Sequence, residues 1–119
     1  LPTISELIGG ETPSEIDGIS LVPTLVGGEQ PQHKFLYWEF YEQGSRQSVR
    51  FGNWSAIREP MLTGDVTLYD VHADPEQNED LAAVHPELVQ KAIGFMQRAH
   101  EPSENWKPRG APNKSAAAR

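Results

Sequence analysis

Apolar and polar residues are arranged differently in the first quarter of the chain and in the rest of it. Residues 1–8 place Ile4, Leu7 and Ile8 on one helical face and stop at a glycine pair. Residues 20–25 form a second apolar group, which also ends near a glycine pair. This pattern predicts a short helix over residues 1–8 and a short helix or helical turn over residues 20–25.

Four stretches between residues 35 and 70 have the pattern of β-strands. Residues 35–41 are rich in aromatic side chains, which favour a pleated, half-buried surface. Residues 46–51 alternate, so that Gln47, Val49 and Phe51 share one face. Residues 54–58 repeat the alternation after a Gly-Asn turn, and residues 66–70 supply a fourth strand. Because each connection is too short for a parallel crossover, the sheet is predicted to be antiparallel.

A longer helix is predicted after the strands, from Pro86 to about His100. Extended structure ends before it, at Asp74-Pro75, where a carboxylate can accept hydrogen bonds from the amides that follow. Apolar residues recur in the helix at spacings of three and four, which predicts one apolar stripe facing the sheet. The stripe consists of Val89, Ala92, Ile93, Met96 and Ala99. The sequence therefore predicts an α+β fold: a four-stranded antiparallel sheet packed against a C-terminal helix, after two short helices.

Charge and composition narrow the classes of partner. Residues 1–101 carry 6 Lys and Arg against 16 Asp and Glu, whereas residues 102–119 carry 4 against 1. An acidic body repels a phosphate backbone, so nucleic acid is not an expected partner. The sequence has no Cys and no apolar run long enough to span a membrane, and its first residues do not have the charged start of a signal peptide. Residues 102–119 are rich in proline and lack periodicity, which predicts a disordered tail or an arm on a partner, with Trp106 as its one anchor.

A polar hairpin tip between the first two strands is the candidate ligand-binding segment. Its carboxylate, amide and guanidinium groups suit sugar hydroxyls and anionic sulfates. The alternative interpretation is an exposed polar turn with no ligand. The candidate substrate-binding residues are Glu42, Gln43, Arg46 and Gln47.

Histidine and acidic residues do not form a recognisable metal motif. The spacings of His33, His72, His85 and His100 match no compact ligand pattern. Structural roles at the two ends of the long helix are expected for His85 and His100, and His72 is expected to be solvated in a turn. An acidic run follows the last strand, but it lacks the central Gly and the length of a Ca²⁺ loop. No metal site is therefore predicted from the run that contains Asp74, Glu76, Glu79 and Asp80.

Several segments, in order, resemble the C-terminal region of sulfatases, the formylglycine enzymes of the alkaline phosphatase superfamily. They are residues 1–9 (LPTISELIG), residues 17–25 (DGISLVPTL), YWEF at 37–40 with RQSVRFGNW at 46–54, and LYDVHADPEQNEDLA at 68–82. Ser55 departs from the family, which often has Lys after the tryptophan. The resemblance implies that residues 1–28 end the catalytic domain, that residues 29–101 form the C-terminal subdomain, and that residues 102–119 are a tail.

The same resemblance implies a parent enzyme whose chemistry lies upstream. The formylglycine precursor motif is absent from this sequence, so no catalytic residue is expected here. The resemblance places formylglycine and Ca²⁺ in the full-length parent. It implies that this parent is a sulfuric ester hydrolase that acts on a sulfated sugar, in the periplasm or outside the cell. The alternatives are a noncatalytic packing module and the same region of a phosphonate or phosphodiester hydrolase.

The aromatic strand at residues 35–41 suggests how such a region meets its neighbour. Alternate rings face opposite sides of a strand, so one pair should face the helix and the other a neighbouring surface. The expected partner is the upstream catalytic domain, and an isolated fragment could self-associate through the same rings. The four rings are those of Tyr37, Trp38, Phe40 and Tyr41.

Overall fold

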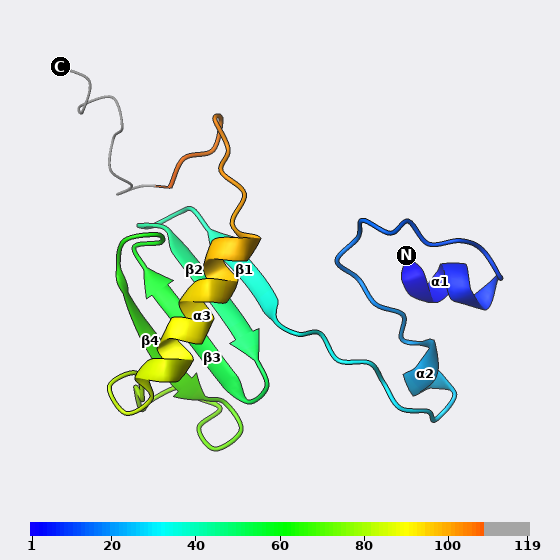
Figure 1. Cartoon of the computed structure of the whole chain (residues 1–119), viewed down its shortest axis with the longest axis horizontal. Coiled ribbons are helices and arrows are strands. Elements are labelled where there is room, and N and C mark those ends of the chain that lie inside the picture. Colours follow the sequence, from blue (N-terminus) through cyan, green and yellow to red (C-terminus); the bar gives the residue numbers. More distant parts are fainter. Residues whose placement is uncertain (109–119) are drawn as a thin grey trace. The chain divides into compact units, whose positions relative to one another are not determined.

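The computed structural model describes residues 1–108, which form two compact units, one of them Leu1–His33 and the other starting at Lys34. The first unit contains α1 (Pro2–Leu7) and α2 (Val22–Leu25). Both helices carry proline in the first turn, where the missing N–H breaks no intrahelical bond. The two short helices confirm the expectation for this part of the chain (Figure 1).

Polar side chains tie the first unit together, whereas most of its aliphatic side chains are exposed. Leu21 N donates to Thr3 Oγ1 over 3.1 Å, which links α2 to α1. Gln30 Nε2 donates to the carbonyl oxygen of Ser20 over 2.8 Å. By contrast, Ile4 is 60% exposed. The unit is thus held by local hydrogen bonds and has very little apolar core.

The second unit begins with a four-stranded antiparallel meander in the order β1-β2-β3-β4. The strands are β1 (Leu36–Phe40), β2 (Arg46–Phe51), β3 (Trp54–Glu59) and β4 (Asp65–Asp70). One row of paired residues crosses the whole sheet and points to its inner face: Tyr37, Val49, Ala56 and Leu68. The last three are fully buried. The alternation in the sequence thus identified the buried face correctly.

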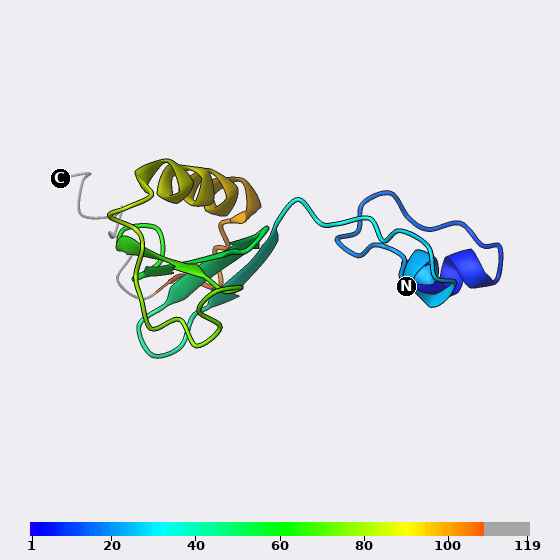
Figure 2. The same cartoon turned by 90° about the horizontal axis from the view of Figure 1, so that it is seen from below.

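The helix α3 (Pro86–Ala99) lies across that inner face and closes the core (Figure 2). Ala92 and Met96, from the predicted stripe, are fully buried against the sheet. Phe95 is also buried although it lies outside the predicted stripe. The reason is that the sheet covers a wider part of the helix surface than the single stripe of residues. Its ring stacks on Phe35 with centroids 4.5 Å apart. The predicted α+β fold is confirmed.

The link between β4 and α3 is a turn built on acidic side chains. Asp74 Oδ2 accepts a hydrogen bond from Glu79 N over 2.9 Å, and Asp80 Oδ1 accepts from Leu68 N and Ala82 N, each over 2.9 Å. These carboxylates satisfy backbone amides that have no ladder or helix partner.

In residues 1–108, no helix is long and apolar enough to cross a membrane.

The segment after α3 has neither helix nor strand over residues 102–108. The Trp106 ring nevertheless meets the Tyr41 ring edge-on, with centroids 5.9 Å apart. Trp106 therefore makes one ring contact with the residue that follows β1, and the disordered tail or arm predicted for residues 102–119 stays a prediction. The remainder of the predicted tail, residues 109–119, lies outside the described residues.

Candidate functional site

The hairpin between β1 and β2 has an unusually contorted backbone. Gln43, Gly44 and Ser45 follow one another with φ of 51°, 111° and 64°. Left-handed conformations of this kind are uncommon for residues other than glycine and persist where the surroundings hold them. Glu42 and Gln43 are exposed at the tip, whereas Ser45 is fully buried beneath it. The tip thus presents one carboxylate and one amide to solvent on a fixed backbone.

Arg46 starts β2 directly after the tip and carries the positive charge of this region. Its Nε donates to Glu59 Oε2 over 2.6 Å, and both side chains are about half exposed. A guanidinium has five N–H donors, and this ion pair uses the one on Nε. The geometry suits an anion that approaches the outer edge of the guanidinium, at the end of the sheet.

Gln47 is separated from the other three candidates because its side chain faces the interior. It is only 1% exposed. Its Nε2 donates to Tyr37 Oη over 3.0 Å, and its Oε1 accepts from Leu62 N over 2.7 Å. The period of two in β2 already placed residue 47 with Val49 and Phe51. That alternation is the signal by which sequence reasoning could have set Gln47 apart from the exposed tip.

Sequence reasoning missed a hydrogen-bonded group centred on Glu39. Tyr37 Oη and Tyr41 Oη donate to its two oxygens over 2.5 and 2.6 Å, and His100 Nδ1 lies 2.6 Å from Oε1. The group joins β1 to the end of α3, because His100 follows the last helical residue. Residues 39 and 100 are distant in sequence and match no motif, so only the fold brings them together.

The group shifts the pKa values of its members in opposite directions. Burial alone would raise the pKa of Glu39, but hydrogen bonds from both tyrosines and from His100 lower it below its ordinary value of 4.5. Burial, followed by the hydrogen bond to Glu39, raises the pKa of Tyr41 to about 12. The same causes raise the pKa of Tyr37 further. The carboxylate is therefore ionised and both phenols are neutral at pH 7, which suits a structural tie.

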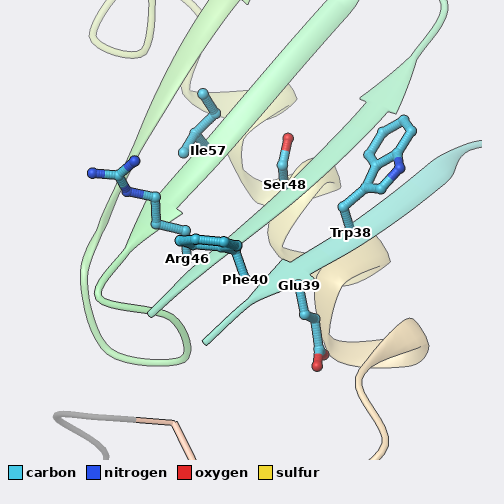
Figure 3. A pocket seen from close by; sticks show the side chains of 6 residues that line it. All are labelled: Trp38, Glu39, Phe40, Arg46, Ser48 and Ile57. Carbon is cyan, nitrogen blue, oxygen red and sulfur yellow. The ribbon is translucent and has the colours of Figure 1, made fainter. Parts of the chain in front are cut away.

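The outer face of the sheet carries exposed apolar side chains beside Arg46 (Figure 3). Leu36, Trp38 and Phe40 point away from α3 and are 40%, 51% and 47% exposed. An open hollow of about 360 Å³ lies over this face. Figure 3 shows Trp38, Phe40 and Arg46 around it, with Glu39 pointing away. The hollow is lined by Trp38, Glu39, Phe40, Arg46, Ser48 and Ile57.

The histidines take separate places. His85 packs edge-on against Trp54 with centroids 5.1 Å apart, and His100 belongs to the Glu39 group. His33 and His72 are exposed. Within residues 1–108, no three His, Asp or Glu side chains gather as ligands of one metal ion.

Comparison with known proteins relates this chain to sulfatases. No model of a known protein family matches it. It is 34% identical over 71 residues to an uncharacterized sulfatase of Schizosaccharomyces pombe, a match covering 56% of this chain and 12% of that protein. The structure of BT4656 in complex with its substrate D-glucosamine-2-N,6-O-disulfate superposes with a TM-score of 0.66 and 24% identity. The match covers 82% of this chain and 22% of that one.

A third match is the phosphonate monoester hydrolase of Agrobacterium radiobacter, with a TM-score of 0.56 and 21% identity over 82% of this chain and 22% of that one. Identities this low establish a shared fold. This chain thus spans about a fifth or less of the proteins it matches. Together with the sequence match, the shared fold supports the resemblance to a sulfatase C-terminal region.

Proposed function

We propose that this chain is the C-terminal region of a longer sulfatase, which hydrolyses a sulfuric ester of a sugar. The observation that carries the proposal is the agreement of two independent signals. The chain has sequence identity to a sulfatase over 71 residues, and its fold recurs in a structure with a bound sulfated sugar. BT4656 holds a sulfated glucosamine as its substrate, which supports a sulfated sugar for this protein as well.

In this proposal the chain completes the fold and supplies no catalytic group. The exposed rings of Trp38 and Phe40 are covered by the upstream catalytic domain, because such a patch is costly to leave in water. Residues 1–28 belong to that domain, which would bury the aliphatic side chains of α1. Formylglycine and Ca²⁺ act upstream in the parent. An isolated fragment, lacking this cover, associates with itself through the same face.

The hairpin tip flanks the substrate entrance of the parent enzyme. Arg46 offers charge-assisted hydrogen bonds to an anionic sulfate, and Glu42 and Gln43 offer an acceptor and an amide to sugar hydroxyls. Their exposure and fixed backbone support this role. Their task is to bind and orient the sugar while the reaction proceeds at upstream residues.

The test is Arg46→Ala in the full-length enzyme, assayed on a sulfated sugar. We expect KM to rise about tenfold with little change in kcat. The reason is that an ionic hydrogen bond made equally in the substrate complex and in the transition state affects binding alone. Glu59→Gln is the matched control, because it removes the Arg46 ion pair and keeps the guanidinium. Arg98→Ala, on α3, controls for loss of charge elsewhere. An unchanged KM in Arg46→Ala would contradict the role of the tip.

A second candidate function is supported by the phosphonate monoester hydrolase match. The full-length protein should be assayed in parallel on a sulfate ester and a phosphonate monoester, and the larger kcat/KM decides between them. The 119-residue chain should be assayed alone on both. Hydrolysis by the chain alone would refute its noncatalytic role, and activity confined to the full-length protein would support it. Inactivity of the full-length protein would favour a packing module.

A further inference from the structure

Two loops at one end of the sheet are joined by hydrogen bonds outside the strand ladders. They are the hairpin tip, residues 42–45, and the link between β3 and β4, residues 60–64. Met61 N donates to the carbonyl oxygen of Ser45 over 3.3 Å. Leu62 N donates to Gln47 Oε1 over 2.7 Å, directly below the tip. The two loops therefore lie against each other although some fifteen residues separate them in sequence.

Three residues at the base of the two loops are buried. Met61 and Ser45 are 0% exposed and Gln47 is 1% exposed. Leu62 has φ of 70°, which a branched aliphatic residue keeps only where its surroundings hold it. The hydrogen bond from the Leu62 N–H to Gln47 Oε1 is one contact that favours this conformation. Thr63, which follows Leu62 in the same link, is exposed.

The orientation of the Gln47 amide is fixed by the Glu39 group. Tyr37 Oη donates its proton to Glu39, so its oxygen accepts from Gln47 Nε2. Because Nε2 is committed to Tyr37, Oε1 faces Leu62 N, which requires an acceptor. The Gln47 amide thus pairs with both a donor, the Leu62 N–H, and an acceptor, the Tyr37 Oη, which face it from opposite sides. An apolar residue of equal length would leave both unpaired.

We propose that residues 60–64 and the hairpin tip form one recognition surface for the anionic sugar, and that Gln47 is the buried positioning residue joining them. The proposal rests on the proposed function and extends it in two ways. It adds Leu62, which is half-buried, and Thr63 as a second wall of the surface, beside the first wall of Glu42, Gln43 and Arg46. It also changes Gln47 from a candidate ligand contact into the residue that sets the distance between these two walls.

The first test measures amide hydrogen exchange in the 119-residue chain carrying Gln47→Met. Methionine keeps the length of the side chain and loses both hydrogen bonds. We expect exchange at Leu62 N–H and Met61 N–H to become about tenfold faster or more, as befits a lost buried hydrogen bond. Amides in the middle of α3 should keep their rates. Gln97→Met, the same substitution at an exposed helix position, should leave Met61 and Leu62 unchanged.

Two results would overturn the joining role of Gln47. One is faster exchange at Leu62 with Met61 unchanged, which would show that the loops open separately. The other result is measured in the unmodified chain, which also serves if Gln47→Met does not fold. In that chain, the amide exchange rates of Met61 and Leu62 should increase equally in low urea, because the two amides belong to one unit that opens together. Unequal increases would contradict the joining role.

The second test uses the full-length enzyme and a sulfated sugar. Gln47→Met should raise KM about fivefold and change kcat by less than twofold, because misplaced contacts weaken binding while the chemistry lies upstream. Thr63→Lys, at the proposed second wall, should change KM for a sulfated sugar more than KM for a small aryl sulfate. Equal changes for both substrates would overturn the second wall. The exchange result is independent of activity, so failure of the sulfatase assignment is distinguishable from failure of this inference.

Discussion

The N-terminal unit, residues 1–33, and the second unit, which contains the sheet and α3, have similar aliphatic residues. These side chains are mostly exposed in the first unit and buried in the core of the second. Leu7 on α1 is 58% exposed, whereas Leu68 on β4 is fully buried. Both positions lie in segments whose apolar periodicity is correct for their secondary structure. The difference is that α3 packs over the face of β4 that carries Leu68. Amphipathic patterning thus identifies which face of an element is apolar but does not supply the partner.

The two units also differ in what their polar groups accomplish. In the first unit, Gln30 bonds to the carbonyl of Ser20 at an only partly buried position. In the second, the bonds from Gln47 to Tyr37 and Leu62 and the bond between Glu39 and His100 join different elements, and Gln47 is only 1% exposed. Water competes for exposed bonds, so buried ones of the same length contribute more to stability.

The largest expected effect tests the burial difference with one substitution at matched residues. Leu68→Ala should lower the free energy of unfolding by about 3 kcal/mol, because it deletes a fully buried side chain and leaves a cavity. Leu7→Ala should change it by less than about 0.5 kcal/mol. Urea unfolding followed by circular dichroism measures both. Equal losses at the two positions would refute the contrast between the units.

The next effect tests the Glu39 group, which has no counterpart in the described N-terminal unit. Glu39→Gln should cost about 1.5 kcal/mol at pH 7, because bonds to an ionised acceptor are the stronger kind. The folded pKa of Glu39 is lowered, so its contribution is complete above the ordinary value of 4.5 and is lost as pH falls through the lowered pKa. Urea unfolding at several pH values should show the two proteins converging in acid. Glu6→Gln, on α1, is the matched control.

Alkaline pH tests the same group from the tyrosine side and should have a smaller effect. The pKa of Tyr41 is raised, so the stability that its neutral phenol contributes is present below the ordinary value of 10 and is lost between 10 and about 12. We expect about 1 kcal/mol or less, since solvent reaches this ring. Tyr41→Phe should flatten that part of the stability–pH curve. A curve of unchanged steepness would show that the phenol does not titrate as inferred.

The smallest effect concerns the segment after α3, which resembles the N-terminal unit in lacking a core. Trp106→Ala should cost about 0.5 kcal/mol, the value of one edge-on ring contact at an exposed position. Urea unfolding measures the change, and Tyr41→Phe, which keeps the ring, should preserve the contact. A loss as large as that of Leu68→Ala would mean that residues 102–108 belong to the core.

Local pattern was sufficient for the elements of this protein. The aromatic strand, the strict alternation after the hairpin and the helical stripe each concern neighbouring residues, and all three are present as predicted. The sequence also indicated that the rings of residues 35–41 divide between the two faces of the sheet, and the structure places Trp38 and Phe40 on the face away from the helix. Backbone periodicity determines such facts, because side-chain direction repeats every two residues in a strand and every 3.6 in a helix.

The candidate site was only partly predictable, for a reason visible in Gln47. Its residue type suggested a ligand contact, and its strand parity suggested burial. The structure gives it Tyr37 and Leu62 as partners, the second of which lies on a loop that sequence patterns leave undefined. Glu39 and His100 show the same limit, since sixty residues separate them.

The sequence by itself determined the four strands, the long helix, the alternation of side chains along the strands and the resemblance to sulfatases. Only the tertiary structure decided that Gln47 bonds to Tyr37 and Leu62, that residues 60–64 lie beside the hairpin tip, and that Glu39 binds the end of α3. Short-range rules act through the backbone and are written in consecutive residues. Contacts between distant residues depend on how the meander and its helix close on one another, and that is a property of the folded chain as a whole.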